Sequence, residues 1–234
     1  MNLFIFGDSI GQGIVQNTVS QRYEILKLNL QKLLGLSQSV SYTNFSMLGS
    51  TIARGLSTIE KHADKLSEND LVLLEFGGND CNFPWKEVAN APEMEHKPKT
   101  SLESFVKTYQ SAVGKIQKSG AKPILMNLPP LIAKRFLNWV SAGINAENIT
   151  KFLGDAEMIY RWQELYSLAV VKLAKMLSVP LIDIRSEFLC RQDMLDLLGS
   201  DGMHPTRKGY ELIAKTVYDQ LAFLSPGVLS CFSG

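Results

Sequence analysis

The sequence predicts an α/β protein in which helices cover both faces of a parallel sheet. Two observations support this fold class. Five short apolar segments alternate along the 234 residues with longer stretches of helical periodicity. The composition, with 45% apolar and 20% charged residues, is ordinary for a globular chain. No repeat or linker interrupts the pattern, so we expect one domain over residues 1–234.

The expected strands are apolar runs that end at glycine, proline or polar residues. The first, Leu3–Phe6, is apolar throughout and stops at Gly7. Pro129-Pro130 follows the fourth and prevents its extension. The five expected strands are residues 3–6, 40–45, 70–76, 122–127 and 179–184. Parallel strands of this kind are buried on both faces.

The expected helices carry apolar residues three or four positions apart. Leucines at this spacing predict a helix over 22–35, with Gly35 as its stop. Thr100 or Ser101 is suited to cap the helix that follows it. Pro205 is suited to begin the last helix. The remaining expected helices cover 52–66 and 155–177, whereas 131–154 is irregular or contains short helices.

Charge and hydropathy exclude several classes of partner. With 24 basic and 23 acidic residues, the net charge is +1, and no basic run indicates a nucleic acid or an anionic membrane. No run approaches the roughly 20 apolar residues that span a bilayer. The N-terminus, Met1-Asn2 followed at once by Leu3, lacks the pattern of a signal peptide. We therefore expect a cytoplasmic protein.

The cysteines do not predict a metal site or a disulfide framework. Cys81, Cys190 and Cys231 are odd in number and far apart, and no Cys/His ligand spacing occurs. Three reduced thiols are the simplest interpretation.

The polar motifs all fall where expected strands end. Gly7-Asp8-Ser9 follows the first strand, Gly49 the second, and Gly77-Gly78-Asn79-Asp80 the third. The segment 201–204 follows the fifth strand more distantly. Ligands of open parallel sheets bind beyond the carboxyl ends of the strands, so these remote residues are predicted to converge on one site.

Ser9 is a candidate nucleophile. A serine on a glycine-flanked turn at a helix N-terminus has an exposed hydroxyl and a free N–H. Taken alone, a helix-capping serine is the simpler interpretation. Gly7-Asp8-Ser9-Ile10-Gly11 also fits the G-x-S-x-G elbow of α/β-hydrolases. That elbow follows a strand in the middle of the chain, so we discount this assignment.

His204 is the candidate base. Asp201 precedes it by three residues, and a carboxylate at this spacing can bind one ring nitrogen while the other accepts a serine proton. An Asp-Gly turn with a capping histidine is the alternative. His62 and His96 lie in polar stretches and are expected at the surface.

An oxyanion needs fixed hydrogen-bond donors. The candidates are the backbone N–H groups of Ser9 and Gly49 and the side-chain amide of Asn79. Glycine permits close approach of the backbone to a ligand, which suits Gly49. Ordinary turns remain the alternative for both glycine-containing segments.

Taken together, the four motifs resemble the SGNH (GDSL) hydrolase superfamily. The family's motifs carry a nucleophilic Ser, an oxyanion Gly, an oxyanion Asn and the histidine of D-x-x-H. In the same order, this sequence has Ser9, Gly49, Asn79 and the segment from Asp201 to His204. The resemblance spans residues 3 to about 220. It implies a flavodoxin-like α/β/α sandwich with strand order 2-1-3-4-5, and neither metal nor cofactor. It also implies hydrolysis of an ester through an acyl-enzyme on Ser9.

The substrate is expected to be a small-molecule ester. Residues 81–99 and 130–154 are expected insertions near the site, and Phe83 and Trp85 in the first of them are candidates to contact substrate. Asp8, Asp80 and Met203 belong to the motifs themselves and complete this set. Short loops around the site favour a small acyl group of the acetyl type, possibly on a carbohydrate. An acyltransferase, or a non-catalytic phosphate-binding module of flavodoxin type, is the alternative function. The sequence does not indicate an oligomeric state.

Overall fold

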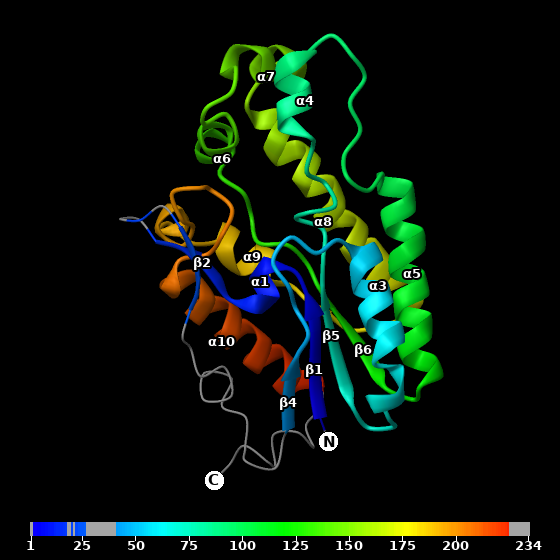
Figure 1. Cartoon of the computed structure of the whole chain (residues 1–234). Helices are drawn as coiled ribbons and strands as arrows, with labels where there is room; N and C mark the ends of the chain where they lie inside the picture. Colours follow the sequence, from blue (N-terminus) through cyan, green and yellow to red (C-terminus); the bar gives the residue numbers. More distant parts are fainter. Residues whose placement is uncertain (1, 18–19, 21, 27–40, 225–234) are drawn as a thin grey trace.

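A parallel five-stranded sheet forms the centre of the computed structural model, which describes residues 2–17, 20, 22–26 and 41–224 (Figure 1). The strand order is β4-β1-β5-β6-β7, and each neighbouring pair is parallel. This order confirms the expected 2-1-3-4-5 arrangement of the flavodoxin type. The strands are β1 (Asn2–Gly7), β4 (Ser41–Asn44), β5 (Leu71–Glu75), β6 (Lys122–Met126) and β7 (Leu181–Ile182).

Alternating side chains of the strands pack against helices on opposite faces of the sheet. On one face, Phe4 and Phe6 of β1 join the core formed with α3 (Ile52–Lys61), α5 (Leu102–Lys118) and α8 (Glu157–Leu177). On the other face, Leu3 and Ile5 pack in the core formed with α9 (Ile184–Leu189) and α10 (Arg207–Leu224). The period of two in a strand produces this division. The three-layer α/β/α architecture is thereby confirmed.

Helix α5 illustrates how local sequence fixes an element. Ser101 caps its N-terminus by accepting a hydrogen bond from the N–H of Ser104. One stripe of the helix, which includes Phe105, Tyr109 and Val113, is fully buried against the sheet. The Tyr109 hydroxyl also donates to the carbonyl of Leu74 in β5, which ties the helix to the strand.

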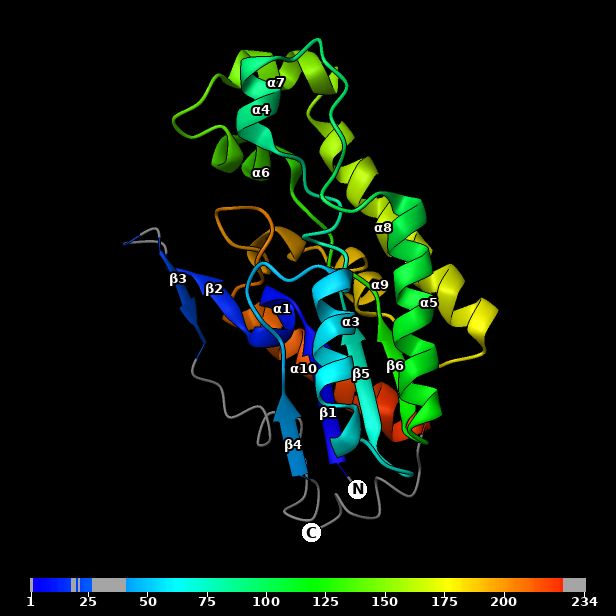
Figure 2. The same ribbon diagram turned by 45° about the vertical axis from the view of Figure 1, so that its right-hand side comes forward.

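The segments 81–99 and 130–154 together form a cap beyond the carboxyl edge of the sheet (Figures 1 and 2). The first segment contains a helix that the sequence did not indicate, and the second contains short helices, one of its two expected forms. The cap contains α4 (Trp85–Asn90), α6 (Ala133–Val140) and α7 (Ala146–Leu153). The Asn148 side chain of α7 donates to the carbonyl of Ala89 in α4, which links the two segments.

The expected helix over 22–35 is wrong at its beginning. Tyr23–Ile25 forms the short strand β3, which pairs antiparallel with β2 (Ile14–Gln16). This pairing with the preceding segment overrides the helical spacing, which carries no information about a partner strand. Residues 27–35 lie outside the described part of the chain.

The expected fifth strand is shorter than 179–184, because Asp183 instead caps α9 by accepting a hydrogen bond from the N–H of Ser186. Pro205 lies before α10, and the Thr206 hydroxyl accepts from the N–H of Gly209 in its first turn. None of the helices in the described residues is both long enough and apolar enough to cross a membrane.

Candidate active site

Ser9 lies at the point where β1 ends and the short helix α1 (Ser9–Gln12) begins. Asp8 caps this helix, because its Oδ1 accepts a hydrogen bond of 2.9 Å from the N–H of Ile10. Below the loop, the Tyr210 hydroxyl donates to the carbonyl of Ile14 at 2.8 Å. These contacts fix the serine at the carboxyl edge of the sheet, where ligands of such sheets bind.

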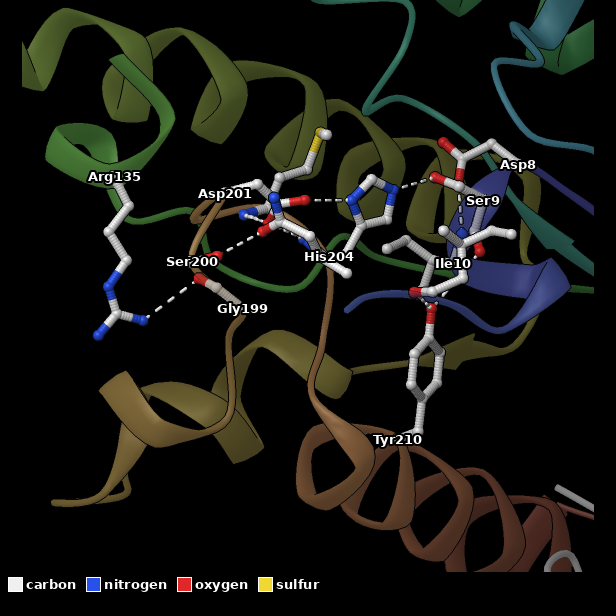
Figure 3. Close-up of polar contacts among 12 residues, drawn as sticks. Asp8, Ser9, Ile10, Arg135, Gly199, Ser200, Asp201, His204 and Tyr210 are labelled. Atoms are coloured by element: carbon white, nitrogen blue, oxygen red, sulfur yellow. Dashed lines mark hydrogen bonds and ion pairs between the residues drawn. The ribbon is translucent and has the colours of Figure 1, made fainter. Parts of the chain in front are cut away.

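His204 joins Ser9 to Asp201 in one chain of hydrogen bonds (Figure 3). The distance between His204 Nε2 and Ser9 Oγ is 2.9 Å, and that between His204 Nδ1 and Asp201 Oδ2 is 2.6 Å. The Asp201 carboxylate is acceptor only, so Nδ1 carries the proton and Nε2 is left to accept the serine proton. The imidazole and the Asp201 carboxylate are both almost completely buried.

Glycine is required in the turn that carries Asp201 and His204. Gly202 has a φ of +71°, and a Cβ atom at this residue would lie 2.5 Å from the carbonyl oxygen of Ile132. The Gly202 carbonyl in turn accepts a hydrogen bond from the N–H of Ile132, at the entrance to α6. Arg135 of α6 also donates to the carbonyl of Leu198, so the catalytic turn is anchored on the cap.

Asp201 is held as an anion. Burial alone would raise the pKa of its carboxyl group, but the bonds from the His204 ring and from the N–H groups of Met203 and His204 outweigh burial and lower that pKa. An ionised Asp201 can therefore orient the imidazole and stabilise it when it becomes protonated.

Of the candidate oxyanion donors, Asn79 bonds to the residue before Ser9, whereas Gly49 is linked to the Ser9 loop only through its neighbours. The Asn79 amide donates one N–H to Asp8 Oδ2 at 3.1 Å, which leaves its second N–H for a ligand. Gly49 lies in an exposed turn with a φ of +79°. Its neighbours attach this turn to the Ser9 loop, because the N–H of Met47 bonds to the Gly7 carbonyl and that of Leu48 bonds to the Gln12 side chain.

Comparison with models of protein families identifies the family. The model of the GDSL-like lipase/acylhydrolase family matches residues 3–217. The chain belongs to this family. Membership places the protein among the carboxylic ester hydrolases. No curated protein sequence matches the chain.

Solved structures share the fold over nearly the whole chain. The lipase/acylhydrolase from Enterococcus faecalis has a TM-score of 0.65 at 17% identity, with 95% of this chain and 96% of that chain covered. Axe2, an acetylxylan esterase from Geobacillus stearothermophilus, has a TM-score of 0.63 at 18% identity, with 95% and 94% covered. A lipolytic protein of the G-D-S-L family from Veillonella parvula has a TM-score of 0.63 at 15% identity, with 94% and 97% covered.

In this GDSL hydrolase, the Asp80 side chain binds the start of α3. Its side chain is fully buried, and both carboxylate oxygens lie 3.1 Å from the N–H of Ile52, at the start of α3. Burial raises the pKa of this carboxyl group to about 6. Asp80 therefore positions α3 and does not line the cavity beside the site, and its expected contact with substrate stays a prediction. The other expected substrate-contacting residues, Asp8, Phe83, Trp85 and Met203, do line the cavity beside the site.

Glu75, a buried carboxyl group beneath the Ser9 loop, is not among the site residues that the sequence predicts. Its Oε2 accepts hydrogen bonds from the N–H groups of Asp8, at 3.3 Å, and Gly11, at 3.1 Å. Burial, together with the charge of the neighbouring Asp8 carboxylate, raises the pKa of Glu75 well above its ordinary value. The Asp8 and Glu75 carboxyl groups are close enough for each to affect the pKa of the other, and Glu75 Oε1 is buried without a hydrogen-bond partner. One signal could have indicated it, because Glu75 is the single charged residue in the apolar run Leu71–Phe76.

Tyr23 of β3 was also missed, because it lies in the segment expected to be helical. Its ring packs against the His204 ring with a centroid distance of 4.7 Å, and against Trp139 of α6 at 6.0 Å. Tyr23 thus connects the β2–β3 hairpin and the cap on one side of the imidazole. In the described ranges, no group of three or more His, Cys, Asp or Glu residues is arranged to hold a metal ion.

Proposed function

We propose that the protein hydrolyses carboxylic esters through an acyl-enzyme on Ser9. The observation that carries this proposal is the pair of hydrogen bonds that joins Ser9 Oγ to His204 Nε2 and His204 Nδ1 to Asp201. A hydroxyl, a base and an orienting carboxylate in this order are the parts that a serine nucleophile needs.

In the first half of the reaction, His204 Nε2 takes the proton of Ser9 as Oγ forms a bond to the ester carbonyl carbon. The resulting oxyanion accepts hydrogen bonds from the Asn79 amide and from the N–H groups of Ser9 and Gly49. The bond from the carbonyl carbon to the alcohol oxygen then breaks, and the proton on Nε2 passes to the leaving alcohol. Asp201 stabilises the imidazolium while it carries that proton.

In the second half, a water molecule replaces the alcohol. His204 takes a proton from this water, the water oxygen attacks the acyl carbon, and the bond to Ser9 Oγ breaks. Ser9 recovers its proton from Nε2, and the carboxylic acid leaves. An acyltransferase would follow the same steps with a different acceptor, so the choice between water and another acceptor is decided outside this group of side chains.

The alternative of a phosphate-binding module is disfavoured by the charges below the Ser9 loop. Asp8 and Glu75 are both buried there, and burial raises the pKa of both carboxyl groups. A bound phosphate would add negative charge beside this pair, which is costly where little solvent screens it.

The expectation of an acetyl-type acyl group depended on short loops around the site. The segments 81–99 and 130–154 instead form a helical cap over a cavity. Axe2, one of the similar structures, is described as an acetylxylan esterase. At 18% identity this likeness shows the fold alone and does not decide the acyl group.

Labelling with a fluorophosphonate tests the nucleophile without knowledge of the natural substrate. We expect the wild type and a Ser57→Ala control, in which an exposed serine of α3 is removed, to be labelled equally. Ser9→Ala should not be labelled, and its kcat on nitrophenyl esters should fall by about 10⁴-fold or more. Equal labelling of Ser9→Ala, or the absence of labelling in the wild type, would contradict the proposal.

A further inference from the structure

A cavity of about 310 Å³ lies under the cap, and residues next to the proposed catalytic groups line it. Four of its lining residues are direct neighbours of these groups in the chain. Asp8 and Ile10 flank Ser9, Gly78 precedes Asn79, and Met203 precedes His204. An acyl carbonyl held between Ser9 and Asn79 therefore has this cavity directly beside it.

The walls of the cavity are aromatic and aliphatic side chains from several segments of the cap and from α8. Phe83 is central, since its ring contacts those of Trp85, Phe152 and Trp162 at centroid distances of 5.5 to 5.7 Å. On the α8 side, Met158 and Ile159 complete the apolar lining. Apolar walls of this kind favour a ligand without hydrogen-bonding groups.

Three of the polar side chains in the cavity wall are already bonded to protein groups. The Gln163 amide donates to the Pro129 carbonyl at 2.9 Å and accepts from Arg185 at 3.0 Å. His96, expected at the surface, bonds through Nε2 to the Ala91 carbonyl at 2.8 Å. Asn82 accepts a hydrogen bond from the Trp85 indole. Among the described lining residues, Glu75 Oε1 and the Trp162 indole N–H have no partner, so a sugar ring in this space would recover only a few of the hydrogen bonds to water that it loses, which is unfavourable.

The volume sets the size of the ligand. An apolar cavity of about 150 Å³ binds benzene, which has six carbon atoms. A cavity of about 310 Å³ has twice that capacity and therefore suits a ligand of roughly eight to twelve carbons. An acetyl group would leave most of the apolar surface without contacts.

We propose that this cavity binds the acyl chain of the substrate and that the chain is a medium-length aliphatic one of roughly eight to twelve carbons. The proposal depends on the hydrolysis proposed above, since the chain enters the cavity when its carbonyl lies at Ser9. The alcohol then leaves on the other side of the carbonyl carbon. The cap thus selects the acyl group.

A series of p-nitrophenyl esters from acetyl to dodecanoyl, kept below their micellar concentrations, measures this selection. Burial of each methylene is expected to raise kcat/KM by about fourfold until the cavity is filled. After losses from chain ordering, we expect the octanoyl ester to exceed the butanoyl ester by about tenfold or more. A kcat/KM that is highest for acetyl and falls with length would overturn the proposal.

Two substitutions on α8 provide a matched pair. Met158→Trp places a larger side chain in the cavity, whereas Leu165→Trp makes a similar change at a side chain that is 42% exposed outside the cavity. We expect Met158→Trp to lower kcat/KM for octanoyl by at least about tenfold and to leave that for acetyl within about twofold. Leu165→Trp should retain the wild-type profile. An equal effect of both substitutions on the chain-length profile would contradict the assignment.

Ligand binding to Ser9→Ala separates failure of the cavity proposal from failure of the proposed hydrolysis. We expect decanoate to raise the melting temperature of Ser9→Ala and acetate at the same concentration to leave it unchanged. Stabilisation by decanoate without Ser9-dependent hydrolysis would support the cavity and contradict the hydrolysis. The opposite result is hydrolysis that depends on Ser9, with no stabilisation by decanoate and no preference for longer chains. It would contradict binding of the acyl chain in the cavity and would support the proposed hydrolysis. Failure of Met158→Trp to fold does not affect this measurement.

Discussion

The loops that carry the proposed catalytic residues and the cap lie side by side but are held by different interactions. In the loops, directed hydrogen bonds fix each group, and the Asp201 carboxylate alone accepts bonds from the His204 ring and from two backbone N–H groups. In the cap, aromatic rings such as those of Phe83 and Trp85 surround an apolar cavity, and contacts between rings set its shape. The difference indicates that the reaction is fixed by hydrogen bonds, whereas the preference for an acyl group depends on packing.

The sharpest test of this division is Asp201→Asn. The Asn oxygen can still accept from the N–H groups of Met203 and His204, but its amide now donates toward the imidazole and favours the wrong tautomer. We expect kcat to fall by about 10³- to 10⁴-fold, by the same factor for acetyl and octanoyl esters. An exposed Asp196→Asn serves as the control and should behave as the wild type. A loss of kcat that differs between the acetyl and octanoyl esters would contradict the separate roles of the loops and the cap.

The sequence could predict the catalytic loops because each is short and local. Gly7-Asp8-Ser9 and the 201–204 turn keep their geometry through contacts within a few residues, such as those from Asp8 to Ile10 and from Asp201 to His204. Their convergence followed from the common carboxyl edge of a parallel sheet. The strand order and the roles of Asn79 and Gly49 required the resemblance to a family.

The cap could not be predicted in the same way. Its cavity is formed by side chains from segments far apart in the chain, such as Phe83 and Trp162, and helical periodicity does not specify which of them meet. Likewise, the leucine spacing after Tyr23 predicted a helix where Tyr23–Ile25 forms a short strand. The partner of this strand, Ile14–Gln16, precedes it in the chain. Glu75 was missed because its role depends on Asp8, which lies on a neighbouring strand end.

Asn79→Ala tests a smaller contribution of the loops. Removal of one oxyanion donor typically lowers kcat by about 10²- to 10³-fold, with a small change in KM. The bond from Asn79 to Asp8 is lost as well, so thermal unfolding is measured in parallel. Asn90→Ala, at an exposed asparagine of α4, is the control. If kcat falls by less than about tenfold in the folded variant, Asn79 does not bind the oxyanion.

The smallest expected effect concerns the buried carboxyl pair, and it appears in stability. The pKa of Glu75 is raised in the folded protein, so its contribution to the free energy of unfolding is present below its ordinary pKa of 4.5 and is lost as the pH rises through the raised value. Glu75→Gln removes this dependence, since the Gln oxygen can still accept from the N–H groups of Asp8 and Gly11 while its neutral amide does not titrate.

We therefore expect Glu75→Gln to match the wild type near pH 4.5 and to be more stable at pH 7 by at least about 1 kcal/mol. Urea unfolding between pH 4.5 and 8 measures the difference. Glu211→Gln, at an exposed residue of α10, should give a curve parallel to that of the wild type. A parallel curve for Glu75→Gln would show that Glu75 ionises normally. Since Glu75 does not touch the reacting atoms in the proposed mechanism, kcat should change by no more than a few-fold, in contrast to the loss in Asp201→Asn.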